Sequence, residues 1–439
     1  MTISRRKFLK STAAGVLLPS IVPIGAKSFS GAPSDRIRVG LIGCRNHGFN
    51  ILRLHLNEPN VVCTALCDVD RNVLEGRAAD VEEIQGSRPS MYGDHRQFLE
   101  DPEIEAVIIG TPDHWHCIQF VDALEAGKHV YVEKPIANSI EECNIMRRAA
   151  HQHPELTVQV GQNQRSGIHW ADAMERIHSG EMGHIRRMHI WCNFNYGLGQ
   201  PVVPDEPVPE GVDFDRWLGP APERSFNPSR FHGSWRMFWD YGGGLITDWG
   251  VHLIDMALWA GNITKPPEEV MAYGGIFSRF ERAHETPSTL SVNWKMDDFC
   301  FTWEHTAGIQ TGPYGIPYGL SFTGDNGTLV INRETWWLTP ESGGDGPRME
   351  AVPEQSGRQY HDLHVRNFLH CIRTGDQPAC DIDKGWTAAI FAHIGNLSQR
   401  TGRSLRYDEE RNIFLNDPEA TRLITPEYRA PWRLPEVQG

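Results

Sequence analysis

The pattern of apolar and polar positions changes character once along the chain. Between residues 37 and 160, short apolar runs alternate with segments whose apolar positions recur at the helical period. The predicted buried strands are 37–42, 61–66, 106–109 and 129–132, and helices are predicted from about 47 and at 72–84, 116–126 and 139–151. Because strands that alternate with helices form parallel sheets through right-handed crossovers, this half predicts a doubly wound α/β domain.

Longer strands with alternating polarity follow residue 160. They are predicted at 188–193, 270–277, 290–296, 299–305 and 320–323. This alternation is typical of an open, mainly antiparallel sheet that buries one face. A Pro-rich and aromatic stretch at 197–236 has little periodicity, which indicates a functional or interface loop. The predicted units are a leader at 1–32, domains at 36–160 and 161–410, and a tail at 411–439.

The leader has the features of an export signal. Ser-Arg-Arg-Lys-Phe-Leu-Lys at 4–10 precedes an apolar stretch at 13–24 that two prolines interrupt. The motif resembles a twin-arginine signal, and the apolar run is too short for a comfortable membrane span. We therefore expect export of the folded protein, to the periplasm or otherwise out of the cytoplasm, without a stable membrane anchor. The cleavage point stays open.

Composition argues against several classes of partner. Acidic residues outnumber basic ones by 56 to 42 among 439 residues. Nucleic-acid binding relies on clustered Lys and Arg, so no nucleic-acid partner is expected. The nine cysteines form no CxxC pair and follow no regular spacing, so neither a metal site nor a disulfide framework is expected.

A glycine motif, Gly-Cys-Arg-Asn-His-Gly, directly follows the first predicted strand. Gly43 and Gly48 match the first and third glycines of a dinucleotide fingerprint, and Arg45 replaces the second. Alone, this motif fits an ordinary strand-to-helix turn equally well, although a guanidinium suits a phosphate. Asp68 ends the second strand, where a carboxylate accepts hydrogen bonds from ribose hydroxyls and repels a 2′-phosphate. The two signals together predict NAD rather than NADP.

Two more motifs follow the next two strands: Thr-Pro-Asp-His-Trp-His at 111–116 and Tyr-Val-Glu-Lys-Pro at 131–135. With the glycines and Asp68, they resemble the NAD-binding half of the glucose-fructose oxidoreductase, inositol dehydrogenase and MocA (Gfo/Idh/MocA) family. The later segments extend this resemblance over about residues 36–410.

The resemblance implies roles for single residues. Pro112 flanks the nicotinamide, Glu133 contacts its ribose, and Lys134 faces the reacting hydroxyl. His116 is placed near the cofactor in the same way, although a packing role at the helix start is its alternative. In the family's Asn-x-Arg element, Asn163 lies near the cofactor.

The second family block follows a glycine turn at 242–244. Asp248, His252 and Asp255 stand at i, i+4 and i+7, so on a helix they share one face. Oxidation of a secondary alcohol needs a base, and an imidazole that titrates between about pH 5 and 8 suits this task. We predict His252 as the base, Lys134 as the cation beside the developing alkoxide, and Asp248 as an orienting or hydroxyl-binding group. Asp255 stays open between a substrate contact and a supporting role.

Substrate contacts are predicted on both sides of this block. Arg165 ends the Asn-x-Arg element and is the preferred contact there. Trp235, Trp239 and Tyr241 precede the glycine turn, and aromatic faces stack well on sugar rings. Core packing is the alternative for each of the three aromatic residues.

The resemblance implies an NAD-dependent oxidoreductase that transfers hydride from a secondary hydroxyl of a sugar, glycoside or polyol. Because free NAD is scarce outside the cytoplasm, the cofactor is expected to stay tightly bound. One alternative is an NAD-dependent glycosidase or lyase that transiently oxidises a ring hydroxyl. Another is a non-catalytic sugar-binding protein, which the intact Lys134, Asp248 and His252 disfavour. Family members pair through the open sheet, so a homodimer or homotetramer is expected.

Overall fold

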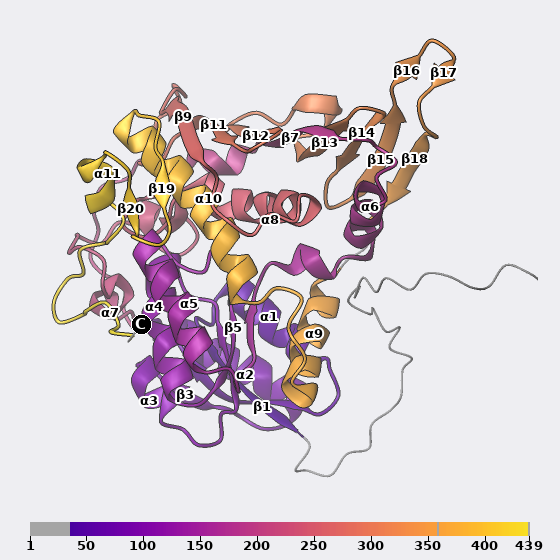
Figure 1. Ribbon diagram of the computed structural model, residues 1–439. Coiled ribbons are helices and arrows are strands. Elements are labelled where there is room, and N and C mark those ends of the chain that lie inside the picture. Colours follow the sequence, from indigo (N-terminus) through magenta and orange to yellow (C-terminus); the bar gives the residue numbers. More distant parts are fainter. Residues whose placement is uncertain (1–35, 358–359, 438–439) are drawn as a thin grey trace, which may run out of the picture.

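The computed structural model describes residues 36–357 and 360–437 and is built on two large sheets (Figure 1). The first sheet is parallel, with the strand order β3-β2-β1-β4-β5-β6. Its strands are β1 (Ile37–Ile42), β2 (Val61–Cys67), β3 (Ser90–Tyr92), β4 (Ala106–Ile109), β5 (His129–Val132) and β6 (Val158–Val160). The order reverses between β1 and β4, where doubly wound sheets bind ligands. The predicted parallel domain is confirmed.

Helices cover both faces of this sheet, and local signals set their ends. They are α1 (Asn46–Leu56), α2 (Arg71–Gln85), α3 (His95–Leu99), α4 (Asp113–Glu125) and α5 (Ile140–Gln152). The Asp70 carboxylate caps α2 and Gly86, at φ 78°, ends it, whereas Ser139 caps α5. Helix α4 begins three residues before the predicted start, because Pro112 at its N-cap favours helix initiation there.

The second sheet has eight strands in the order β18-β15-β14-β13-β7-β12-β11-β9. They are β7 (Ile185–Cys192), β9 (Glu269–Gly275), β11 (Thr289–Lys295), β12 (Cys300–Thr306), β13 (Tyr318–Gly324), β14 (Gly327–Ile331), β15 (Thr335–Pro340) and β18 (Val352–Ser356). Six of its pairs are antiparallel and the β7–β12 pair is parallel. The expected open, mainly antiparallel sheet is therefore present, with one parallel step at its centre.

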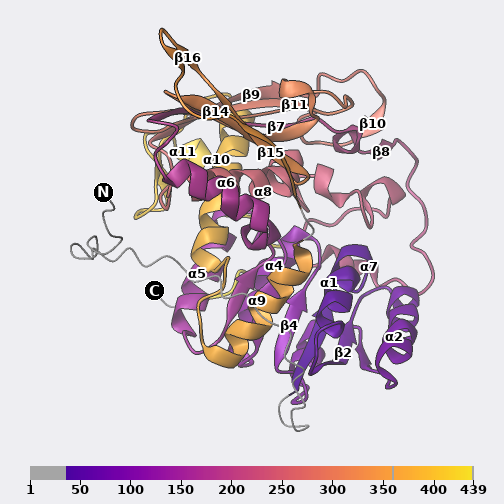
Figure 2. The same cartoon turned by 90° about the vertical axis from the view of Figure 1, so that its right-hand side faces the viewer.

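Three helices pack under this sheet, between it and the first domain (Figures 1 and 2). They are α6 (Ile168–His178), α8 (Val251–Ala260) and α10 (Ile382–Thr401), and α9 (His361–Thr374) packs beside α1. On β11, Leu290, Val292 and Trp294 alternate toward these helices and are buried. Helix α10 also contacts α5, so it joins the two domains through a shared core.

The outer face of the second sheet carries no α-helix of the described chain (Figure 2). On β9, Met271 is 58% exposed and Tyr273 is 76% exposed. Exposed apolar side chains on an open sheet mark an interaction surface. We expect a homodimer or homotetramer through this face, so light scattering should give two or four times the mass of one chain, and Tyr273→Asp should weaken the association. A monomer at micromolar concentration would contradict this prediction.

Two segments cross from the second domain back onto the first. The strap (residues 197–236) contains α7 (Phe214–Leu218) and pairs with the end of β2, where Asp213 N–H donates to the Val69 carbonyl (2.9 Å). The last described part of the predicted C-terminal unit, residues 425–437, follows α11 (Pro418–Arg422) and is called the tail from here on. In the tail, the Tyr428 hydroxyl donates to Glu142 Oε1 (2.6 Å) and Arg429 Nη1 donates to Asp215 Oδ1 (2.6 Å).

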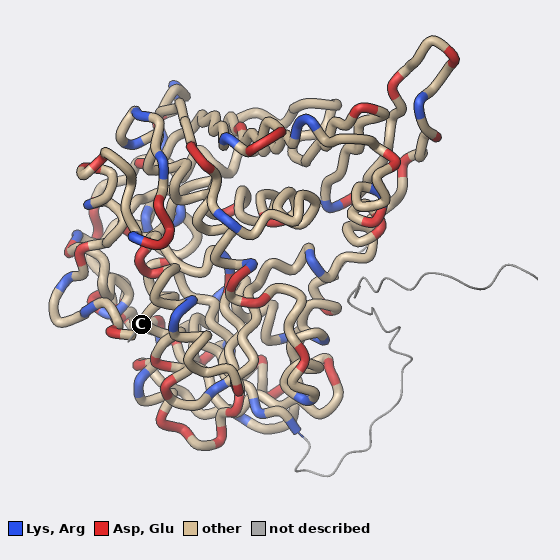
Figure 3. The backbone as a smooth tube through the Cα atoms, in the orientation of Figure 1, with Lys and Arg blue, Asp and Glu red and all other residues tan. Residues whose placement is uncertain are grey.

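The predicted export signal lies outside the described residues. Within the described part, no helix has the length and apolar character needed to cross a membrane. No group of His, Cys, Asp and Glu side chains there is arranged to hold a metal ion, and all nine cysteines are free thiols. Acidic and basic residues are interspersed over both domains (Figure 3).

Candidate active site

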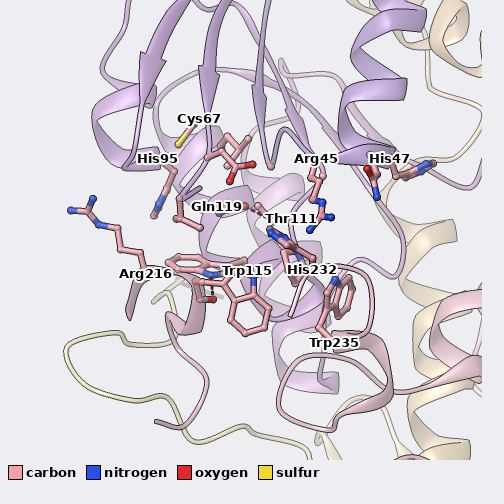
Figure 4. A pocket seen from close by; sticks show the side chains of 18 of the residues that line it. Arg45, His47, Cys67, His95, Thr111, Trp115, Gln119, Arg216, His232 and Trp235 are labelled. Carbon is pink, nitrogen blue, oxygen red and sulfur yellow. Dashed lines mark hydrogen bonds between the residues drawn. The ribbon is translucent and has the colours of Figure 1, made fainter. Parts of the chain in front are cut away.

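A cleft opens at the carboxyl ends of the parallel strands, and the predicted cofactor residues Gly43, Arg45, Asp68 and Pro112 line it (Figure 4). The strap closes its other side with Arg216, His232 and Trp235. The cleft therefore lies where strand order reverses, between the first domain and a segment of the second.

The glycine motif forms a cradle that side chains would fill. Gly43 has φ 85°, and a Cβ at this position would lie 2.8 Å from Thr111 N. A Cβ at Gly48 would collide with the Gly43 carbonyl. Arg45, at the N-cap of α1, extends its guanidinium into the cleft and forms no ion pair with a described carboxylate (Figure 4). A free guanidinium beside a helix N-terminus suits a pyrophosphate.

Asp68 is held in place by backbone donors. Its Oδ2 accepts from Cys44 N–H (2.7 Å) and its Oδ1 from Asp70 N–H (2.9 Å). Burial raises the pKa of this carboxyl to about 6, so it is mainly ionised at neutral pH. Each oxygen keeps a lone pair for a ribose hydroxyl.

Several buried polar atoms near Lys134 lack hydrogen-bond partners. Asn163 Oδ1 is one of them, and Glu133 Oε1 has no hydrogen bond in the described chain beyond its ion pair with His47 Nε2 (3.2 Å). Although burial acts to raise the pKa of Glu133, His47 and Lys134 lower it to about 2, so this carboxylate is ionised. Gly161 leaves room for it, because a Cβ there would lie 2.8 Å from Glu133 Oε1. Unsatisfied buried polar groups call for a polar ligand, and these residues fit the ribose and nicotinamide amide of NAD.

His116 joins two loops of the site. Its ring nitrogens lie 2.8 Å from the Pro135 carbonyl oxygen and 2.9 Å from that of Thr111. Burial lowers the pKa of His116, and the two carbonyl oxygens act against this shift. The structure thus gives His116 a positioning role, which holds the Glu-Lys-Pro loop against the Thr-Pro loop.

The predicted catalytic cation and carboxylate are in direct contact. Lys134 Nζ donates to Asp248 Oδ1 (2.8 Å) and to the Asp248 carbonyl (3.0 Å). Asp248 lies in a π-helical turn (Ile246–Gly250) before α8, a geometry frequent at functional sites. Against the effect of burial, Lys134 and Arg236 hold the pKa of Asp248 well below its usual range. Asp248 is therefore a permanent anion that orients Lys134.

His252 is buried on the first turn of α8, beside this pair. Its Nδ1 has no hydrogen-bond partner in the described chain. Burial first, and then the cations Lys134 and Arg333, put its pKa well below the ordinary value of 6.5. The imidazole is therefore neutral at physiological pH and can accept a proton.

Arg165 and Asp255 are brought together in a buried ion pair. Arg165 Nη2 and Nε lie 2.7 and 2.9 Å from Asp255 Oδ1. Asp255 is fully buried, and the pair joins the Asn-x-Arg turn to α8. Arg165 and Asp255, which were both predicted to contact the substrate, therefore bind each other. Their ion pair holds the Asn-x-Arg turn against α8.

The three predicted aromatic contacts have different surroundings. Trp235 lines the cleft, and the Arg236 guanidinium stacks on its ring at 4.3 Å. Tyr241 is fully buried against Trp217, at a ring-centroid distance of 4.9 Å. Trp239 packs under Arg400, 5.0 Å from its ring. Only Trp235 of the three therefore faces the cleft.

Three residues of the site were not predicted from the sequence. Arg236 Nε donates to Asp248 Oδ1 (3.1 Å), and the Tyr196 hydroxyl also bonds this carboxylate. Trp432 of the tail lines the cleft and meets Trp115 edge-on at a centroid distance of 4.8 Å. Arg236 has one sequence signal, its place next to the glycine turn. Tyr196 and Trp432 have none, because their partners lie far away along the chain.

Two family models match the chain. Residues 37–162 match the oxidoreductase family's NAD-binding Rossmann fold, and residues 186–268 and 349–434 match its C-terminal alpha/beta domain. The chain belongs to the Gfo/Idh/MocA oxidoreductase family. Its first domain is accordingly the NAD-binding Rossmann domain of that family.

The similar proteins fall into two groups. A glycosyl hydrolase family 109 protein from Shewanella putrefaciens is 33% identical over 162 residues, which are 32% of this chain and 35% of that protein. An alpha-N-acetylgalactosaminidase from Shewanella oneidensis is 30% identical over the same shares. The WlbA dehydrogenase from Bordetella pertussis, solved with NADH and UDP-GlcNAcA, is 19% identical with a TM-score of 0.61, covering 85% of this chain and 99% of its own. The curated relatives thus match over about a third of their length, and the solved structure shares the fold.

Cofactor choice follows from Asp68. Because this carboxylate lies at the ribose position, NAD should bind at least tenfold more tightly than NADP, whose 2′-phosphate it repels. Asp68→Ser should reduce the ratio of the NAD affinity to the NADP affinity. Titration of both dinucleotides by quenching of tryptophan fluorescence measures it, and equal affinities in the unaltered protein would contradict this assignment.

Proposed function

We propose that the protein is an exported, NAD-dependent oxidoreductase that transfers hydride from the carbon bearing a secondary hydroxyl of a sugar or glycoside to a tightly held nicotinamide cofactor. One observation carries this proposal: Lys134, oriented by Asp248, and a neutral, buried His252 lie together beside the cofactor cleft. An alcohol dehydrogenase needs this combination of cation and base.

Lys134 and His252 have different roles in the removal of the hydroxyl proton. Lys134 has three N–H donors, of which two are used on Asp248, so one is left for the substrate oxygen. The neutral imidazole of His252 accepts the hydroxyl proton. As the oxygen gains negative charge, Lys134 stabilises it, and the buried setting strengthens this attraction. When bound, NAD supplies the hydride acceptor.

A glycosidase that works by transient oxidation is the second candidate, favoured by the similarity to family 109 proteins. This activity needs the same first step and a further acid or base. Tyr196, which interacts with Asp248, is a candidate for that role.

One experiment separates the candidates. The purified protein is incubated with pooled glycosides without added NAD, while nicotinamide absorbance and released sugar are followed together. Stoichiometric reduction without release supports the oxidoreductase, and repeated release without net reduction supports the glycosidase. The absence of both signals, although NAD is bound, would contradict both.

The strap and the tail support tight retention of the cofactor. The strap closes the cleft opposite Asp68, where His232 Nε2 lies 3.3 Å from Asp70 Oδ2. The tail places Trp432 against Trp115 at the same end of the cleft. Residues of both segments line the cleft, and added contacts of this kind suit an enzyme exported with its cofactor.

We therefore expect Trp432→Ala to speed the dissociation of NADH by about three- to tenfold, the value of one aromatic pair. Displacement of NADH by excess NAD, followed by nicotinamide fluorescence, gives this rate. Arg433→Ala, which changes an exposed neighbour in the tail, is the matched control. Equal rates of NADH dissociation in the two variants would show that the tail does not contribute to cofactor binding.

A further inference from the structure

Arg333 lies in the turn between β14 and β15 and is coupled to the predicted base. Its guanidinium carbon lies 4.2 Å from the centre of the Trp249 ring. Its Nε donates to Gln164 Oε1 (3.1 Å), and the Gln164 amide donates to the His252 carbonyl (3.4 Å). The cation is therefore fixed relative to the first turn of α8.

This cation has no carboxylate partner. Three other cations around the reaction centre do: Lys134 and Arg236 contact Asp248, and Arg165 contacts Asp255. No described carboxylate lies within ion-pair distance of Arg333, and its two terminal nitrogens form no hydrogen bond to a described residue. A half-buried charge is normally paired, and a guanidinium offers a fork that matches a carboxylate.

Trp249 connects Arg333 to the predicted base. The ring centroids of Trp249 and His252 are 6.4 Å apart. Phe194 and Tyr318 also pack against the Trp249 indole, at centroid distances of 4.7 and 5.1 Å. The Arg333 guanidinium and the His252 imidazole thus both neighbour the same indole ring.

We propose that Arg333 binds a carboxylate of the substrate, so that the enzyme acts on hexuronic acids or their glycosides in preference to neutral sugars. This inference rests on the proposed function, because it names the substrate class of the same site. Arg45 and Arg333 then divide the anionic groups between them: Arg45 faces the cofactor phosphates and Arg333 faces the substrate.

The test uses the NAD-loaded protein and two matched series of probes. One series contains the methyl glycosides of hexuronic acids, and the other contains the methyl hexosides of the same configurations. Binding is measured by calorimetry, so that no turnover is needed. The unaltered protein should prefer at least one hexuronide over its hexoside by about ten- to a hundredfold, the value of a charge-assisted hydrogen-bonded pair.

Arg333→Gln should remove this preference and change hexoside affinity by no more than about twofold, whereas Arg333→Lys should restore part of it. Arg400→Gln is the matched control, because Arg400 also stacks on a tryptophan, but on Trp239 and not on Trp249, the indole that neighbours His252. It should leave the preference unchanged.

Three outcomes would overturn the inference: equal affinity for both series in the unaltered protein, an equal loss for both in Arg333→Gln, or no binding of either at millimolar concentration. Selective hexuronide binding without NAD reduction or glycoside cleavage would instead refute the proposed function and leave the carboxylate site standing. The two failures are thus distinguishable.

Discussion

His252→Ala should lower the single-turnover rate of bound NAD reduction by about 10²- to 10⁴-fold, the usual contribution of a general base. The affinity for NAD should stay the same, because the cofactor residues Asp68 and Arg45 are untouched. Rapid-mixing absorbance of the reduced nicotinamide measures this step apart from product release.

The pH dependence of this rate tests the same assignment. The pKa of His252 lies well below 6.5 in the folded protein, because it is buried and surrounded by positive groups. The base is therefore already neutral at pH 7, and the rate should be flat there and fall only in the acid range. The structure thus moves the ionisation predicted from the sequence, between about pH 5 and 8, toward or below the lower end of that window. His252→Ala should abolish the acid limb.

A buried histidine outside the site provides the control. His305 is buried on β12, and burial lowers its pKa to about 4. His305→Gln should reduce the melting temperature and leave the single-turnover rate within about twofold, since it touches no reacting group. An acid limb that persists in His252→Ala would move the base elsewhere, with Lys134 and Tyr196 as the next candidates.

Local motifs were readable from the sequence because local sterics determine them. The glycine cradle, the Asp68 position and the strands on either side depend on residues close together along the chain. Strands β3 and β6 were missed because three residues are too few to show a period. The parallel β7–β12 pair was missed because alternation reveals which face of a strand is buried and not the direction of its neighbour.

Side-chain partnerships were harder to predict, because they join distant segments. Arg165 was expected at the substrate, yet it pairs with Asp255, 90 residues away. A free arginine and a paired one have the same local sequence, so only the fold shows that Arg333 has no carboxylate. For the same reason no local signal predicts that Trp432 of the tail lines the cofactor cleft.

Lys134→Met should lower the rate of hydride transfer by about 10²- to 10³-fold, the usual effect of losing a donor to a developing oxyanion. The acid limb of the pH profile should remain, because His252 is unchanged. The substitution should also destabilise the fold by about 1–3 kcal/mol, since it leaves the buried Asp248 carboxylate with Arg236 as its remaining cation.

The loss of stability and the loss of rate must therefore be separated. Lys134→Gln, whose side-chain amide can still donate to Asp248 Oδ1, should regain part of the unfolding free energy that Lys134→Met loses in urea titrations. Its rate should stay low, because no cation faces the substrate oxygen. If the rate returned together with the stability, Lys134 would only hold the fold of the site, and the charge that stabilises the alkoxide would have to come from Arg236, the other cation in contact with Asp248.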